Sequence, residues 1–388
     1  MRHLKRVDAD DHCNLIHFVK RNSYFIVKSH YSSKSYLTAK RALRIKRILT
    51  SSFAAKLTIT ASIIANTAFV SSAEVNIYSA RQPFLISKIL NDFTNSTGIV
   101  TNIVYAKQDI AQRLKLEGTF SAADIVLTSD IAPLYELAQL GLTQPVSSVL
   151  LKNNIPAEYR DPQQQWFGLT ARARIIFASK ARVESGEIID YEQLVDKKWK
   201  GRICTRSGKH NYMLSLISSM IVASGEAATE QWLQGLKNNL ARKPQGNDRA
   251  QVKAISEGVC DIALVNSYYF AKMITNKRKP DQIKSAQSVF LVFPNQQDRG
   301  SHINISGMAL TKHAPNKDNA IALMEYLSSD EAQEAYARQN HEFPINPKVE
   351  PSLLLQQYMP DFKRDTVSLA AIAQQHQTAL LLIKKVGL

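Results

Sequence analysis

Residues 74–128 read EVNIYSARQPFLISKILNDFTNSTGIVTNIVYAKQDIAQRLKLEGTFSAADIVLT. Three short apolar runs in this stretch have the length of β-strands, at 75–78, 100–105 and 123–128. The segments between them, 86–93 and 110–116, place apolar residues at helical spacing. Short apolar strands that alternate with amphipathic helices predict an α/β fold, with a mixed, mostly parallel sheet flanked by helices.

The same alternation continues to the C-terminus. Further strands are predicted at 174–178, 201–204, 261–265, 288–293 and 305–310. Further helices are predicted at 212–223, 227–240, 317–328, 331–339 and 368–385. A chain of 388 residues usually divides into two domains, and no low-complexity linker interrupts this one. Two α/β lobes are therefore expected.

The net charge of +16 is concentrated near the N-terminus. Residues 1–73 contain 13 Lys and Arg against 3 Asp and Glu, a net charge of +10. The remaining 36 basic and 30 acidic residues leave a net charge of +6 for residues 74–388, with both signs interspersed. This mixed pattern does not favour a nucleic-acid partner.

The N-terminal region has the pattern of an export signal. A basic cluster at 41–47 is followed by the apolar stretch 57–70 and then by Ser71-Ser72-Ala73, which predicts a signal peptide at 44–73. A retained membrane anchor is the alternative, although the apolar stretch is short for a membrane span. Residues 1–43 fit neither a signal nor a domain, and we assign them no role. We expect the mature protein to be exported.

Two cysteines remain after residue 73, Cys204 and Cys260. An even number of cysteines in an oxidising compartment favours a disulfide between them. Two buried free thiols are the alternative.

The motifs of common enzyme classes are absent from the sequence. It has no phosphate loop of the P-loop type, no Gly-x-Gly-x-x-Gly after the first strand, no Gly-x-Ser-x-Gly and no paired-histidine zinc helix. The five histidines after residue 73 are scattered singly. The pattern favours a protein that binds a ligand and is not an enzyme.

Three tyrosines occupy positions where such a sheet binds ligands. Tyr268 and Tyr269 follow the strand 261–265, and Tyr212 lies at the expected start of a helix after the strand 201–204. Free tyrosine has a pKa of about 10, so only a strongly Lewis-acidic cation deprotonates it at neutral pH. Three phenolates would balance the charge of Fe(III), a hard cation that prefers oxygen ligands. Spacing alone favours the alternative of aromatic packing or a stacking platform for an organic ligand or sugar.

Several motifs together resemble those of a known family. They are YSARQP (78–83), ADIVLT (123–128), WFGLTARAR (166–174), WKGR (199–202), RSG (206–208), PQGND (244–248), NSYY (266–269), ISG (305–307) and HEFP (341–344). In order and spacing they resemble the periplasmic ferric-ion-binding proteins of bacterial ABC importers, over essentially the whole mature chain.

This resemblance implies a two-lobed "Venus flytrap" of the type II binding-protein topology. The N-terminal lobe would comprise 74–174 and 304–350, and the C-terminal lobe 175–303 and 351–388. A monomer would capture Fe(III) in the cleft between the lobes and deliver it to an inner-membrane ABC permease.

The resemblance also implies a set of site residues. Tyr212, Tyr268 and Tyr269 match the metal-ligating tyrosines of the family. Many members carry a histidine ligand where this chain has Gln82, and some carry a carboxylate where it has Asp130. The chain is similar to a subgroup that completes the iron coordination with a synergistic anion, carbonate above all. Arg81, Gln82 and Arg174 are then the expected anion-binding residues.

Two alternatives remain open at this point. The first is a binding protein of the same fold for a polyamine or an oxyanion such as sulfate, which would form no coloured iron complex. The second is an extracytoplasmic enzyme that uses Tyr or Arg for acid–base chemistry, although the sequence shows no nucleophile–base pair for it.

Overall fold

A computed structural model describes residues 73–106, 109–359 and 361–388. The predicted extension at 1–43 and almost all of the predicted signal peptide at 44–73 lie outside these ranges. Within them, no helix has both the length and the apolar character needed to cross a membrane.

The first half of the sheet contains the strands that the opening stretch of sequence predicts. β1 (Glu74–Ser79) lies between β2 (Val100–Tyr105) and β3 (Ile125–Thr128) and pairs in parallel with both. The connecting helices α1 (Ser87–Thr97) and α2 (Ile110–Glu117) occupy the predicted segments. Gly98 ends α1 in a left-handed conformation, with φ of 75°, which glycine adopts without a steric penalty.

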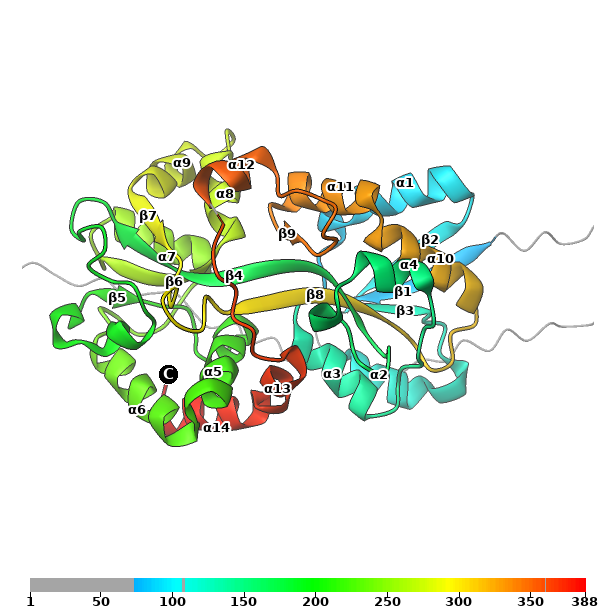
Figure 1. Cartoon of the computed structure of the whole chain (residues 1–388), viewed down its shortest axis with the longest axis horizontal. Helices are drawn as coiled ribbons and strands as arrows, with labels where there is room; N and C mark the ends of the chain where they lie inside the picture. The colour runs from blue at the N-terminus through cyan, green and yellow to red at the C-terminus, as the bar shows by residue number, and fades with distance from the viewer. Residues whose placement is uncertain (1–72, 107–108, 360) are drawn as a thin grey trace, which may run out of the picture. The chain divides into compact units, whose positions relative to one another are not determined.

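Two long strands connect this half with the second one. β4 (Phe167–Ser179) and β8 (Ile303–Leu310) are buried along their whole length and run antiparallel, side by side, through the middle of the described unit (Figure 1). Gly307 allows their close approach, because a Cβ atom there would lie 2.5 Å from the carbonyl oxygen of Phe167.

β4 changes partners along its length. Residues 167–173 pair with β8, whereas residues 174–178 pair with β6 (Ile262–Asn266). The remaining strands are β5 (Ile203–Cys204), which is parallel to β6, and β7 (Val289–Val292) and β9 (Phe343–Pro344), which both pair with β4. This change of partner falls between residues 173 and 174, one residue before the predicted lobe boundary at 174/175, and the boundaries themselves remain a prediction.

The predicted α/β class is confirmed, but the sheet contains more antiparallel pairs than the alternation suggests. All antiparallel strand pairs within the described ranges involve β4 or β8. These two strands carry the chain between the halves, so they do not belong to the strand–helix–strand units that give parallel pairing.

The remaining α-helices of the described ranges surround the two halves. They are α3 (Ile131–Gln139), α4 (Val149–Asn154), α5 (Asn211–Ser224), α6 (Glu226–Asn238), α7 (Asp248–Ser256), α8 (Tyr268–Ile274), α9 (Pro280–Gln287), α10 (Lys317–Ser328), α11 (Asp330–Asn340), α12 (Leu353–Tyr358), α13 (Leu369–Gln374) and α14 (His376–Val386).

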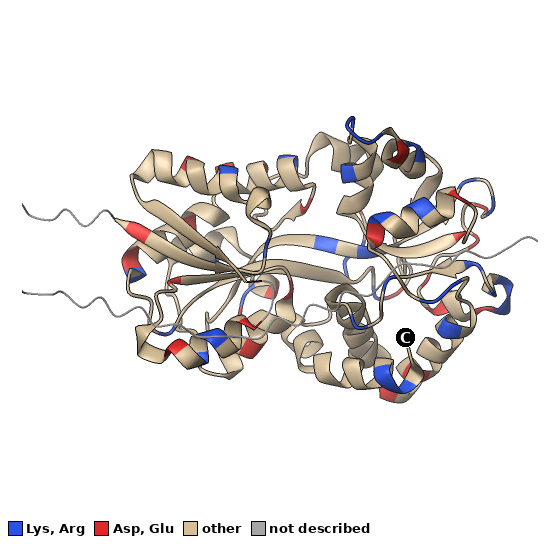
Figure 2. Ribbon diagram, turned by 180° about the vertical axis from the view of Figure 1, so that it is seen from behind, with Lys and Arg blue, Asp and Glu red and all other residues tan. Residues whose placement is uncertain are grey.

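The single C-terminal helix predicted at 368–385 is in fact two helices, which meet at Gln375. The break allows α13 to pack against α3 and α5, while α14 packs against α5 and α6. Basic and acidic residues are interspersed over the described unit, as the charge count predicts (Figure 2).

Candidate metal-binding cleft

The three predicted tyrosines lie in the first turns of two helices. Tyr212 is the second residue of α5, and the His210 side chain caps that helix by accepting a hydrogen bond from the Tyr212 N–H (3.2 Å). Tyr268 and Tyr269 are the first two residues of α8, and only Ser267 separates them from the end of β6. The prediction that they follow the strand directly is confirmed, but they belong to a helix that the sequence analysis did not predict.

A disulfide ties together the segments that lead into these helices. Cys204 of β5 is bonded to Cys260, two residues before β6, with a Cα–Cα distance of 5.8 Å. The predicted disulfide is therefore present, and the free-thiol alternative is wrong. Because β5 and β6 are also paired in parallel, the starting points of the two tyrosine-bearing segments are fixed next to each other.

The structure brings the three phenol groups together. The hydroxyl oxygens of Tyr212 and Tyr268 lie 3.1 Å apart and share a hydrogen bond. The rings of Tyr268 and Tyr269 have centroids 4.4 Å apart, with an angle of 31° between their planes. Residues separated by more than fifty positions in the sequence thus form one cluster.

This tyrosine cluster lines an open cleft of about 620 Å³. Its other walls come from the loop after β1, from the ends of α7 and α8, and from the end of α11. The residues are Gln82, Phe84, Leu85, Arg249, Lys272, Thr275, Asn276, Gln339, Asn340 and His341. The cleft therefore combines residues from the predicted N-terminal and C-terminal lobes.

Burial makes two of the phenols hold their protons tightly. Desolvation, with smaller contributions from Tyr212, Tyr269 and Asp248, raises the pKa of Tyr268 well above its usual value. Burial and the same kind of neighbours raise the pKa of Tyr269 to about 12. A cation must be a strong Lewis acid to displace these protons at neutral pH.

No carboxylate, histidine or thiol cluster competes with the tyrosines as a metal site. Across the described ranges, no group of three or more His, Cys, Asp or Glu side chains is placed to hold a metal ion. The buried Asp130 caps α3 by accepting from the Ala132 N–H (3.0 Å), and it accepts a second bond from the Asn304 amide (2.6 Å). It does not line the cleft.

The three predicted anion-binding residues differ in their positions. Gln82 is exposed and lines the cleft. Arg81 is only 3% exposed, and its guanidinium pairs with the carboxylate of Glu342 at 2.9 Å. Arg174 is also buried and pairs with Asp248 at 2.9 Å. Anion binding by Arg81 and Arg174 stays a prediction, which these ion pairs do not favour.

The ion pair of Arg81 has a strong electrostatic effect on its partner. Burial by itself would raise the pKa of Glu342, but Arg81, with help from Arg172 and Lys272, lowers it to about 2. Glu342 is therefore ionised at neutral pH and holds the Arg81 guanidinium in the protein interior.

Among the cleft residues that the sequence analysis missed, two carry positive charge, Arg249 and Lys272. Lys272 lies four residues after Tyr268, so a predicted helix at 268–274 would have placed both on one face. Arg249 directly follows the PQGND motif at 244–248, which was noted only as part of the resemblance. Burial lowers the pKa of Lys272 to about 8.

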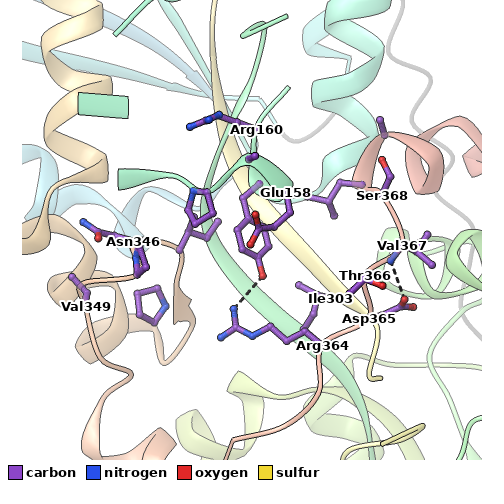
Figure 3. Close-up of a pocket in the computed structure, with 18 of the residues that line it drawn as sticks. Glu158, Arg160, Ile303, Asn346, Val349, Arg364, Asp365, Thr366, Val367 and Ser368 are labelled. Atoms are coloured by element: carbon purple, nitrogen blue, oxygen red, sulfur yellow. Dashed lines mark hydrogen bonds between the residues drawn. The ribbon is translucent and has the colours of Figure 1, made fainter. Parts of the chain in front are cut away.

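Another cavity in the described part of the chain exceeds the tyrosine cleft in volume and contains none of the predicted site residues. It has a volume of about 730 Å³ and is lined by residues within 156–166, 344–351 and 361–370, together with Ile303 (Figure 3). Within it, Arg364 donates a hydrogen bond to the Tyr159 hydroxyl (3.1 Å). Size alone would therefore not have identified the tyrosine cleft.

Two α/β halves joined by long shared strands, with a polar cleft lined from both halves, define a two-lobed solute-binding protein. The chain belongs to the family of bacterial extracellular solute-binding proteins, whose pattern matches residues 121–368. Its relatives are solute-binding proteins of iron transport, so the prediction that the chain is not an enzyme is confirmed.

The chain is similar to several characterised proteins over most of its length. It is 39% identical to iron uptake protein A1 of Synechocystis sp. over 315 residues. The matched region covers 81% of this chain and 87% of that protein. It is 45% identical to the solved ferric iron-binding protein A of Mannheimia haemolytica in an open conformation, with a TM-score of 0.75 and coverage of 81% and 98%. It is 39% identical to a Trichodesmium protein solved with iron and citrate ligands, with a TM-score of 0.77 and coverage of 81% and 99%.

Proposed function

We propose that this protein captures Fe(III) in the periplasm together with a synergistic anion and delivers it to an inner-membrane ABC permease. The observation that carries the proposal is the meeting of the Tyr212, Tyr268 and Tyr269 phenols in one cleft. Export through the predicted signal peptide and function as a monomer are parts of the same proposal.

The donor set suits a ferric ion better than a divalent cation. Three phenolates carry three negative charges, and hard, highly charged cations favour oxygen donors of this kind. Divalent Mg²⁺ and Ca²⁺ are usually held by carboxylates and carbonyls, which the tyrosine cluster does not supply. Since ferric ion commonly takes about six ligands, three phenolates leave about three positions for an anion and water.

Cleft closure gives the N-terminal lobe a role in capture. Gln82, Phe84 and Leu85 face the tyrosine cluster from the loop after β1, so they can contact the bound complex when the lobes close. A closed, loaded form is the state that a permease would recognise.

The relatives support the ferric ion more directly than they support carbonate. The names of the Synechocystis and Mannheimia proteins refer to iron uptake and to ferric iron binding. The Trichodesmium protein was solved with citrate as well as iron, so an organic carboxylate is a second candidate for the anion beside carbonate.

A spectroscopic titration tests the proposal. Ferric ion added to the purified protein in the presence of bicarbonate should produce a visible phenolate-to-iron charge-transfer band that saturates at about one ion per chain. The double variant Tyr268→Phe and Tyr269→Phe should lose the band. Tyr135→Phe is the matched control, because the Tyr135 hydroxyl contacts Gln374 and does not line the cleft.

The absence of a visible band from the wild-type protein with any anion would contradict the proposal. Binding of a colourless polyamine or sulfate in the same cleft would then favour the alternative of a non-metal ligand.

A further inference from the structure

Several basic side chains surround the tyrosine cluster, and most of them have partners within the protein. Arg81 pairs with Glu342, and Arg174 and Arg206 both pair with Asp248, at 2.9 and 3.3 Å respectively. Arg172 donates to the Ser129 carbonyl. These guanidinium groups are therefore held by internal acceptors.

Arg249 and Lys272 differ from the other basic residues of this region. In the part of the chain that the structure describes, no carboxylate lies within ion-pair distance of either side chain. The Arg249 Nε atom is buried without a hydrogen-bond partner, which is also true of the Nε atoms of Arg81, Arg174 and Arg206, so the difference lies in the missing carboxylate. Both residues line the tyrosine cleft, and Arg249 also lines the neighbouring cavity beside α9.

The two cations flank the adjacent tyrosines. The Arg249 guanidinium carbon lies 5.0 Å from the centroid of the Tyr269 ring, and the Lys272 ammonium lies 5.0 Å from that of Tyr268. Arg249 comes from the first turn of α7 and Lys272 from α8, one turn after Tyr268. Two separate helices thus deliver positive charge to the same pair of phenols.

We propose that Arg249 and Lys272 form an oxyanion subsite, which binds the synergistic anion on the side facing away from the metal. This inference rests on the proposed function. A ferric ion with three phenolates is electrically neutral, so an anion of charge −2 or −3 needs compensating charge from elsewhere in the cleft. Arg249 offers a planar fork and Lys272 a compact charge, which both suit carboxylate or carbonate oxygens.

The size of the cleft does not restrict the subsite to carbonate. A volume of about 620 Å³ falls within the range of pockets that hold small organic molecules. The ligand class is therefore a multiply charged oxyanion, either carbonate or a small polycarboxylate, and the experiment must distinguish these two sources.

The test compares iron affinity in the wild-type protein and in the variants Arg249→Gln, Lys272→Gln and the double variant. Iron is titrated with bicarbonate, with citrate and with phosphate as separate anions, and the visible band reports loading. Lys253→Gln is the matched control, since Lys253 lies on α7, points to solvent and pairs only with the exposed Glu257.

We expect each single variant to raise the apparent Kd for iron about tenfold to a hundredfold, as the loss of a charge-assisted hydrogen bond does. The band position should stay unchanged, because the phenolates are intact. Weakening with both bicarbonate and citrate supports a general oxyanion subsite, and weakening with citrate alone supports a subsite for a free carboxylate.

If the double variant bound iron as tightly as wild type with all three anions and kept a normal band, the proposed subsite would be wrong. The proposed function would remain in place. If the wild-type protein showed no visible band when iron was added, the proposed function itself would be overturned. The two failures are therefore distinguishable in one set of titrations.

Discussion

Iron loading should release protons from the tyrosine cluster, and the number of protons can be derived from the site. Burial keeps Tyr268 and Tyr269 protonated in the metal-free cleft, because it raises the pKa of both phenols above the ordinary value of 10. Each phenol that becomes a metal ligand must give up its proton. Protons therefore compete with iron, and the affinity for iron falls as the pH falls.

The magnitude follows from the number of phenolate ligands. Every proton released on binding lowers the apparent affinity about tenfold per pH unit, or about 1.4 kcal/mol. With Tyr212, Tyr268 and Tyr269 all coordinated, the phenols alone account for about a thousandfold loss per pH unit, roughly 4 kcal/mol. Replacing Tyr269 by Phe should reduce this dependence to about a hundredfold.

The assay is a pH-stat measurement near pH 7. Ferric nitrilotriacetate is added to weakly buffered protein, and the base needed to hold the pH counts the protons released. The difference between wild type and Tyr269→Phe cancels protons that come from the chelate or the anion, and should be about one proton per bound ferric ion. The control Tyr135→Phe should match wild type. Equal proton counts for wild type and Tyr269→Phe would refute Tyr269 as a phenolate ligand.

Three further predictions concern stability. Reducing the Cys204–Cys260 disulfide, which links residues 56 positions apart, should lower the free energy of unfolding of the metal-free protein by about 4 kcal/mol in urea titrations, and an unchanged midpoint would contradict this. Arg174→Met should cost about 3–5 kcal/mol in the same assay, because it breaks a buried ion pair with Asp248; a cost below about 1 kcal/mol would show that the pair is not needed. Burial is the largest single influence on Glu342, but Arg81 together with Arg172 and Lys272 outweighs it and lowers the pKa to about 2. The interactions of the Glu342 carboxylate therefore stabilise the fold above about pH 4.5, and this contribution is lost as the pH falls through about 2. Below about pH 4.5, the free energy of unfolding should therefore fall less steeply with decreasing pH in Glu342→Gln than in wild type. Parallel pH dependences of the two proteins would argue against this contribution.

The sequence predicted the parts of the fold that depend on local pattern. The strands at 75–78 and 100–105 and the helix at 317–328 are visible as apolar runs and helical periodicity, and they occur where expected. The helix at 268–274 was missed because it has only seven residues, too few to show a clear helical period, and because Asn266-Ser267 before it has the composition of an ordinary loop.

Long-range pairing was the part that the sequence could not supply. Arg81 and Glu342 are 261 residues apart, and nothing in the local sequence of either shows that they form a buried ion pair. The antiparallel pairing of β4 with β8 could not be predicted for the same reason, because it joins segments more than a hundred residues apart. The positions of the tyrosines after strands drew attention to them, and the resemblance to ferric-ion-binding proteins predicted them as ligands. Arg249 and Lys272, in contrast, could be recognised only from the folded cleft.

Anomalous diffraction at the iron absorption edge tests the central claim most directly. Crystals of the protein grown with ferric ion and bicarbonate should show one strong anomalous peak within bonding distance of the hydroxyl oxygens of Tyr212, Tyr268 and Tyr269. An iron peak elsewhere, with Tyr212 and Tyr268 still hydrogen-bonded to each other as they are here, would contradict the account.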